Sequence, residues 1–307
     1  MRYPVVVFGV KDTTKSFVEY LDQQVCPINL VVTINETLTQ QGNVVSGYSP
    51  LHTLRSSHTD VFEAASYTLD DALSAAFFKE NTFGIGLSMG WSRLIPGEVL
   101  DRFESGVFGL HGSCGYLPFG QGRATLNWSL IRGDWRYVMH MFKLDQHPDS
   151  PNIYAKEMFE VNEFDDIRTL QYKDLIVSKY LASKLLQDYV AGKPLTITHT
   201  DNDPTHWYKG RTPEDGRIDV NAKTREIYNL IRGITRPFPG AFAFVGKERL
   251  SIWASHPFDK TIDFSGYRVG EIIGIFDENL LMRTVDGSLL ITDYCCKANL
   301  KQGDIVV

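Results

Sequence analysis

From the N-terminus to His111 the chain alternates between short apolar runs and segments with helical spacing, and this alternation restricts the fold more than any other feature. Pro4 to Val10 is a continuous apolar run, which is typical of a strand buried on both faces of a parallel sheet. Helical spacing follows over Thr14 to Gln24, and a second strand is predicted over Asn29 to Ile34. Strand and helix in this order indicate an α/β fold with a parallel sheet and right-handed crossovers.

The pattern continues through further elements. We expect strands over Asp60 to Ala64, Phe83 to Ser88 and Gly106 to His111, and helices over Leu69 to Lys79 and Pro96 to Phe103. The first strand is followed by FGVKDTTK rather than G-x-G-x-x-G, so the sheet is Rossmann-like without the usual dinucleotide fingerprint. Ligands of such sheets bind at the carboxyl ends of the strands. The polar loops Lys11 to Thr14, Ser88 to Arg93 and His111 to Arg123 are therefore predicted to converge on one cleft.

A second region of different character is predicted after a long helix over Phe164 to Gly192. Thr196 to Gly216 is rich in Asp, Pro, Thr and Gly, and it is the best candidate for a linker. After a helix over Thr224 to Ile234, short strands with regular turns indicate a small β-barrel. The sequence thus predicts two consecutive domains, residues 1–200 and 207–307.

Charge and composition exclude several classes of protein. The chain has 307 residues with 31 Lys and Arg against 37 Asp and Glu, a net charge of −6 that disfavours nucleic-acid binding. No apolar run approaches the length of a membrane span, and the first residues lack a signal-peptide pattern, so we expect a cytoplasmic protein with no membrane partner. Cys26, Cys114, Cys295 and Cys296 form no disulfide framework and are interpreted as free thiols.

Two polar stretches could carry chemistry. Phe108 to Trp128 places His111 at the exit of an apolar strand, where an imidazole is suited to acid–base work or to capping the loop. Lys143 to Ile153 holds Asp145, His147 and Asp149, a set that could be a metal site or a solvated turn. The spacing matches no strong zinc pattern, which favours the turn, and we expect no metal.

The chain resembles the N10-formyltetrahydrofolate-dependent formyltransferases, most closely those that formylate amino sugars and more distantly methionyl-tRNA formyltransferase. His111 to Asp134 (HGSCGYLPFGQGRATLNWSLIRGD) is similar to the family loop H-G-S-L-L-P-x-Y-R-G-R-A-P-x-N-W. Ser88 to Pro96 resembles the loop that holds the pterin through backbone contacts, and Leu144 to Ile153 resembles the segment with the catalytic Asp. Arg211 to Asp219 and Leu230 to Gly246 resemble the start of the C-terminal subdomain of the sugar enzymes.

The resemblance implies a Rossmann-like catalytic domain followed by an OB-like β-barrel subdomain. It also implies N10-formyltetrahydrofolate as co-substrate and an amine acceptor, which the C-terminal likeness indicates is a nucleotide-linked amino sugar. A homodimer is left open. The residues expected in the site are catalytic His111 and Asp149; folate-binding Met89, Gly90, Trp91, Leu94 and Pro148; and substrate-binding Lys11, Ser113 and Arg123.

Three departures from the family pattern concern this site. The family active site also contains an Asn two residues before the His, and here that position is Gly109. The loop after Ser113 is about two residues longer, and Gln121 replaces the usual Arg. A backbone N–H, a water molecule, Ser113 or Asn127 could replace the missing amide as a donor to the oxyanion.

The function expected from sequence is transfer of a formyl group to a primary amine. Two alternatives stay open: a related enzyme with a different acceptor or acyl group, and a binding relative whose catalysis was lost with the Asn. The longer loop bears on the first alternative, because a loop at the cleft shapes the acceptor pocket.

Overall fold

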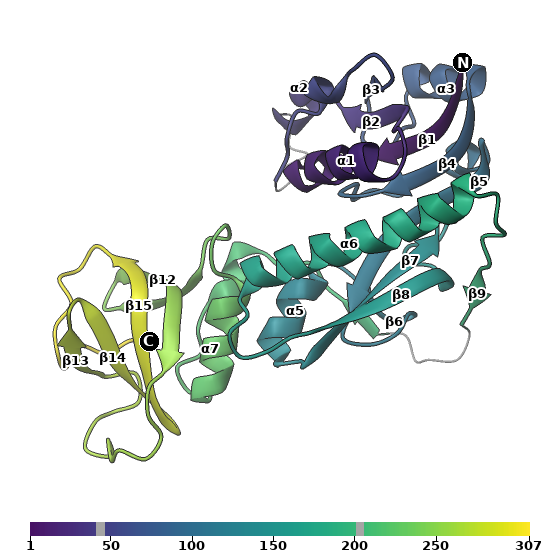
Figure 1. The fold of residues 1–307 in the computed structure, drawn as a ribbon. Helices are drawn as coiled ribbons and strands as arrows, with labels where there is room; N and C mark the ends of the chain where they lie inside the picture. Colours follow the sequence, from purple (N-terminus) through teal and green to yellow (C-terminus); the bar gives the residue numbers. More distant parts are fainter. Residues whose placement is uncertain (41–46, 201–205) are drawn as a thin grey trace. The chain divides into compact units, whose positions relative to one another are not determined.

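The computed structural model describes residues 1–40, 47–200 and 206–307, and within them the chain forms two compact units (Figure 1). The first unit comprises Met1–Gln121, Val138–Met158 and Asp174–Trp207, and the second comprises Gly122–Tyr137, Phe159–Lys173 and Tyr208–Val307. The units are therefore not the two consecutive segments predicted from sequence, because two stretches from before residue 200 pack with the C-terminal region. Residues 201–205 of the predicted linker lie outside the described residues.

The first unit is built on an eight-stranded sheet with the order β3-β2-β1-β4-β5-β7-β8-β9. Its strands are β1 (Arg2–Phe8), β2 (Leu30–Ile34), β3 (Asp60–Ala64), β4 (Thr82–Ser88), β5 (Phe103–Ser113), β7 (Arg136–Lys143), β8 (Asn152–Glu160) and β9 (Thr198–His199). The first five of these pair in parallel, as the continuous apolar runs predict. The predicted α/β class is confirmed.

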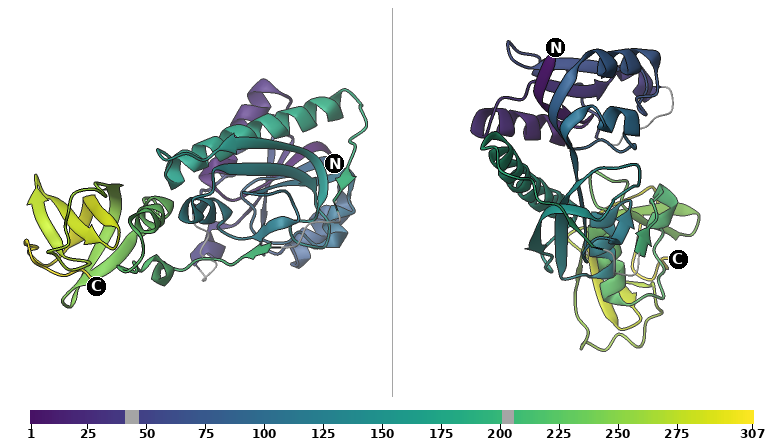
Figure 2. Two further views of the ribbon diagram at one scale, coloured as in Figure 1. Left: turned by 90° about the horizontal axis from the view of Figure 1, so that it is seen from below. Right: turned by 90° about the vertical axis from the view of Figure 1, so that its right-hand side faces the viewer.

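Helices cover both faces of the parallel strands. They are α1 (Asp12–Gln24), α2 (Glu36–Gln40), α3 (Ala72–Glu80), α4 (Gly97–Leu100) and α6 (Ile167–Val190), with a 3-10 turn over His52–Leu54. The views in Figures 1 and 2 place α1 and α3 on opposite faces of the sheet. α3 begins where the Asp71 carboxylate accepts a hydrogen bond from the Ser74 N–H. α6 lies beside α1, since Lys179 Nζ donates to Ser16 Oγ.

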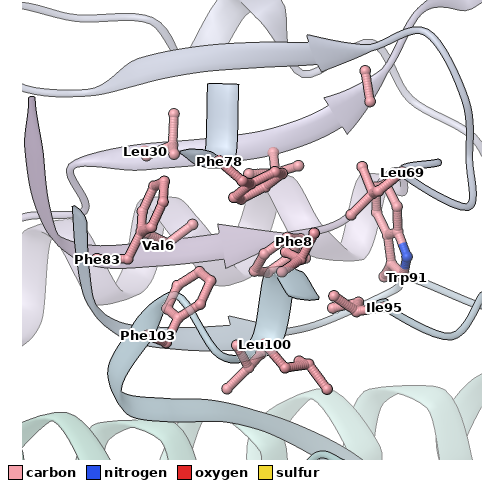
Figure 3. Packing of buried hydrophobic residues seen from close by; sticks show 14 of the residues in the cluster. Val6, Phe8, Leu30, Leu69, Phe78, Phe83, Trp91, Ile95, Leu100 and Phe103 are labelled. Carbon is pink, nitrogen blue, oxygen red and sulfur yellow. The ribbon is translucent and has the colours of Figure 1, made fainter. Parts of the chain in front are cut away.

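The α3 face of the sheet holds an aromatic core (Figure 3). Phe8 from β1 contacts the rings of Phe78 and Phe103, and Phe103 stacks on Phe83 with 4.9 Å between centroids. Burial of several such side chains, each contributing about 1.5–3 kcal/mol, stabilises the stack of strands against α3. This core fixes the position of β1 and β4, whose carboxyl ends carry the expected ligand loops.

β5 is the strand at which the sheet changes direction. Its first part pairs in parallel with β4 up to Ser88 opposite Gly109, and its second part pairs antiparallel with β7 from Phe108 to Ser113. β5 therefore continues past the end of β4, and His111 stands beyond the carboxyl edge of the parallel strands. This edge is where open α/β sheets bind ligands.

The second unit contains an antiparallel sheet with the order β11-β12-β15-β14-β13. Its elements are α5 (Thr125–Arg132), α7 (Thr224–Gly233), β11 (Ala241–Val245), β12 (Glu248–Pro257), β13 (Ile272–Phe276), β14 (Asn279–Thr284), β15 (Gly287–Cys296) and a 3-10 turn over Pro213–Gly216. Val306 pairs with Val245 beside one edge strand, and Ile305 pairs with Glu271 beside the other. The C-terminal residues thus connect the two edges, which closes the small barrel expected from sequence.

The remaining strands, β6 (Phe119–Gly122) and β10 (His206–Tyr208), form a two-stranded sheet. Within the described residues no helix is long and apolar enough to span a bilayer.

Candidate functional site

The structure brings His111 and Asp149 together. His111 Nδ1 lies 3.2 Å from Asp149 Oδ1, and the two side chains are 11% and 20% exposed. His111 comes from the end of β5, and Asp149 comes from the loop between β7 and β8. Two residues 38 positions apart therefore meet at the carboxyl edge of the sheet, with enough exposure to reach a ligand.

The second nitrogen of His111 also has a partner. Nε2 lies 2.8 Å from the carbonyl oxygen of Gly120. Both ring nitrogens thus face oxygen acceptors. A neutral imidazole donates to one of them, and the protonated ring donates to both. A charged acceptor binds an N–H more strongly than a neutral carbonyl does. An oxyanion formed nearby can therefore displace the Gly120 carbonyl from Nε2.

The segment before Asp149 is a hydrogen-bonded turn. The Asp145 carboxylate accepts hydrogen bonds from the His147 N–H, the Ser150 hydroxyl and the Asn152 amide. Burial opposes ionisation, but the hydrogen bonds from Ser150 and His147 outweigh it and lower the pKa of Asp145. Within the described residues no group of three or more His, Cys, Asp or Glu side chains could hold a metal ion. Asp145 therefore shapes the loop that carries Asp149.

Apolar side chains fill the position of the expected Asn. A Cβ atom at Gly109 would lie 2.7 Å from Leu144 Cδ2 and 3.4 Å from Phe142 Cζ. A side chain at position 109 would therefore require the Leu144 side chain to move.

The two side chains considered as substitutes for the Asn are engaged elsewhere. Ser113 is 1% exposed and its hydroxyl donates to the carbonyls of Gly115 and Phe119, so it shapes its own loop. In the second unit the Asn127 amide donates to Gly233 O at 2.7 Å. The Ser113 hydroxyl is thus engaged within its own loop, and one hydrogen of the Asn127 amide is engaged within the second unit. The substrate contact expected from Ser113 stays a prediction.

Two of the residues expected to bind folate are committed to the protein interior. The Met89 N–H donates to Phe8 O, and its carbonyl accepts from the Thr14 hydroxyl. Trp91 is 8% exposed and packs edge-on against Tyr67 and Phe8 in the aromatic core (Figure 3). These contacts place Met89 and Trp91 largely inside the protein, and the folate contacts expected of them stay predictions.

Other parts of the same loop are accessible. Gly90 has φ +78°, and a Cβ there would lie 2.7 Å from Thr14 Oγ, so the position needs glycine. Leu94 is 56% exposed and Pro148 is exposed. Lys11 borders Gly90 through its aliphatic stem.

A cavity of about 480 Å³ lies next to the Asp149 loop. It is lined by α4, which follows the Ser88–Pro96 loop, by the first part of β5, and by residues 143–147. Its lining is half polar in character and includes Asp101, Lys143 and Asp145. The loop that carries Asp149 thus borders this hollow in the first unit, whereas residues 88–96 are not among its lining residues.

Two residues that sequence reasoning passed over belong to this neighbourhood. His140 stands directly opposite His111 in the β5–β7 pairing and is 1% exposed. Burial, together with the nearby His111, lowers the pKa of His140 to about 4. Gln121, noted in the sequence only as a departure, donates its amide to the carbonyls of Pro148 and Asp149. The strand register could have indicated His140, but no sequence signal indicates the role of Gln121.

In the second unit, Arg123 is exposed at the start of α5, where its N–H donates to Tyr208 O. Its guanidinium is therefore available to an anionic group.

These features define an α/β protein with a His–Asp pair at the carboxyl edge of its sheet and a separate antiparallel barrel. The family model "Formyl transferase, C-terminal domain" matches residues 211–301. The match covers most of the second unit's C-terminal segment.

Solved structures share the fold of the whole chain. HypX from Aquifex aeolicus in complex with tetrahydrofolic acid aligns with 99% of this chain and 46% of its own (TM-score 0.62, 15% identity). WlaRD, a sugar 3N-formyl transferase determined with dTDP and 5-N-formyl-THF, covers 97% of this chain and 99% of its own (TM-score 0.64, 15% identity). An N-formyltransferase from Helicobacter canadensis, in complex with folinic acid and dTDP-3-aminofucose, covers 95% and 100% (TM-score 0.58, 17% identity).

The chain spans less than half the length of HypX but nearly the full length of the two sugar enzymes. At 15–17% identity these likenesses show that the chain shares the fold of these proteins, and the family model adds a match over residues 211–301.

Proposed function

We propose that this protein is an N-formyltransferase that moves the formyl group of N10-formyltetrahydrofolate to the primary amine of a nucleotide-linked amino sugar. The observation that carries the proposal is the His111–Asp149 pair, 3.2 Å apart at the ligand-binding edge of the sheet. The His-Gly-Ser loop, the C-terminal domain and the fold shared with WlaRD support the same activity.

His111 and Asp149 suit the two needs of formyl transfer. The carbonyl oxygen of the formyl group gains negative charge when the amine attacks, and an imidazole N–H of His111 stabilises that charge. The Asp149 carboxylate orients the imidazole through Nδ1 and accepts the proton that the attacking amine must lose. The C–N bond to N10 then breaks, and the proton returns to the leaving nitrogen.

The folate is proposed to occupy the 480 Å³ cavity and the loop beside it. Gly90, Leu94 and Pro148 remain the contacts expected from the resemblance, while Met89 and Trp91 support the loop from within. Lys11 and Arg123 are retained as substrate-binding residues, since a cationic side chain suits the phosphates of a nucleotide sugar. The cytoplasmic location and the homodimer stay predictions.

A second candidate is favoured by the position of Gly109. Loss of one oxyanion donor lowers the rate by about 10²–10³-fold, and Leu144 fills the space where a donor would stand. The candidate is a protein that binds folate and a nucleotide sugar but transfers the formyl group slowly or not at all.

A turnover assay separates the two candidates. The purified protein is mixed with N10-formyltetrahydrofolate and TDP-, UDP- and GDP-linked amino sugars, and the mass gain of one formyl group is measured. Formylation of one sugar that is lost in His111→Ala and Asp149→Asn supports the enzyme. Binding of folate by calorimetry with no mass gain on any acceptor would exclude the proposed transfer and favour the binding protein. Transfer that survives in His111→Ala would remove this side chain from the mechanism.

A further inference from the structure

We infer that Gln121 is a positioning residue that fixes Asp149 in the geometry needed to engage His111. The inference deepens the proposed function and rests on it for its catalytic consequence. It starts from one contact: Gln121 Nε2 donates to Asp149 O at 3.0 Å and to Pro148 O at 3.3 Å. A single side-chain amide thus holds both carbonyls that flank the backbone of Asp149.

The backbone of Asp149 needs such support. Its φ is +49°, in the left-handed region that a residue with a Cβ adopts at a cost of about 1–2 kcal/mol. Relaxation to a negative φ would redirect the side chain, and the 3.2 Å contact to His111 would be lost. The Gln121 amide opposes this relaxation because its two hydrogens are matched to carbonyls that keep their positions only in the left-handed conformation.

The support is itself anchored. Gln121 belongs to β6, which pairs with β10. The Ser113 hydroxyl donates to Phe119 O on the same strand, with 3.0 Å between the two oxygens. The neighbouring Gly120 carbonyl accepts from His111 Nε2. Two consecutive residues of β6 therefore contact both members of the pair, one through a carbonyl and one through an amide.

The two contacts differ in what can replace them. An oxyanion displaces the neutral Gly120 carbonyl from His111, whereas the two bonds from Gln121 go to backbone carbonyls of the Asp149 loop and do not involve the ring. An oxyanion can then replace the Gly120 carbonyl as acceptor on His111 while Asp149 stays in place. A side chain at position 121 must donate hydrogen bonds to hold the two carbonyls, so Arg or Lys can replace Gln121. Met has a similar length but no donor, so it cannot replace Gln121.

The test compares Gln121→Met, Gln121→Arg and the control Gln187→Met, which changes an exposed glutamine on α6. Hydrogen–deuterium exchange of residues 145–151 reports the support directly, without any substrate. We expect exchange to rise at least threefold in Gln121→Met and to stay at the wild-type rate in Gln121→Arg and Gln187→Met. Unchanged exchange in Gln121→Met overturns the inference.

Kinetics with an acceptor that the turnover assay identifies test the catalytic consequence. We expect kcat to fall about 10–100-fold in Gln121→Met, because a misplacement near 1 Å can cost that much, while KM for both substrates changes less than threefold. Gln121→Arg should regain most of kcat. A loss confined to KM would assign Gln121 to ligand binding and contradict a positioning role. Failure of the proposed function would be seen separately, as a wild-type protein with no turnover whose exchange still responds to Gln121→Met.

Discussion

At the residue scale, the position that departs most from the family pattern is closely packed. Gly109 faces Leu144 and Phe142, so the strand and the catalytic loop close against each other without a polar group. The sequence alone presented Gly109 as a missing donor. The structure presents it as a packing position, because the neighbour that fills the space lies 35 residues further along the chain.

A first prediction follows for Gly109→Asn. The new Cβ would lie 2.7 Å from Leu144 Cδ2, so the variant should lose about 1–3 kcal/mol in free energy of unfolding and should not gain activity. Denaturant unfolding and the turnover assay measure the two effects. The double variant Gly109→Asn/Leu144→Ala makes room for the amide and serves as the matched comparison. A rise in turnover in the single variant would show that the missing donor outweighs the packing.

A second prediction concerns the pH dependence of stability through His140. In the folded protein burial lowers its pKa to about 4, against about 6.5 in the unfolded chain. The unfolded state therefore takes up the proton first, and the stability due to neutral His140 is present above pH 6.5 and lost as pH falls towards 4. The loss amounts to about 3 kcal/mol.

The measurement is the free energy of unfolding of wild type and His140→Gln at pH 4.5, 5.5 and 7. The difference between the two proteins should shrink as pH falls, since glutamine does not titrate. A difference that stays constant over this range would mean that His140 titrates alike in both states.

At the element scale, β5 shows which parts of a strand can be predicted from sequence. Its apolar run predicted a strand ending at His111, and the structure extends it from Phe103 to Ser113. Antiparallel pairing with β7 supplies the extra length, and sequence patterns do not record a partner. α4 is shorter than predicted. It covers only Gly97–Leu100 of the expected range Pro96 to Phe103, because β5 begins within that range.

A third prediction belongs to α6. Asp174 on this helix is partly buried, and burial raises its pKa to about 7, while Lys11, the residue before α1, counteracts the rise. The folded state thus holds a proton that the unfolded chain releases near pH 3.8. The stability due to protonated Asp174 is full below that pH and is lost as pH rises through 7.

Asp174→Asn should therefore become more stable relative to wild type as pH rises from 4 to 8, by thermal or denaturant unfolding. Asp166→Asn makes a poor control because Asp166 caps the helix, whereas Lys184→Gln changes an exposed charge on the same helix. An Asp174→Asn effect independent of pH would place an ordinary pKa on this carboxyl.

At the scale of the whole molecule, the sequence predicted both architectures but not how the chain is divided between them. The barrel was readable from its turns, and the α/β sheet from its apolar runs. The assignment of Gly122–Tyr137 and Phe159–Lys173 to the second unit was not readable, because it depends on contacts between distant residues. Arg232 is one of them: its guanidinium donates to the carbonyls of Asn162 and Asp165, and Asn127 donates to Gly233 O.

The fourth prediction follows from this division. A protein truncated after Trp207 retains residues 122–137 and 159–173. It loses the residues that bond to their polar groups and cover their apolar side chains, including Ile231, which packs against α5. Buried polar groups without partners and exposed apolar surface are both strongly unfavourable. The truncated protein should therefore lack a cooperative thermal transition, bind a hydrophobic dye and be cleaved within residues 122–137 by limited proteolysis. A longer protein that ends after Ile234 keeps α7 and Arg232. It should be cleaved less within residues 122–137, because α7 again covers α5. A truncated protein that melts cooperatively with uncut 122–137 would show that the first domain is complete at residue 207.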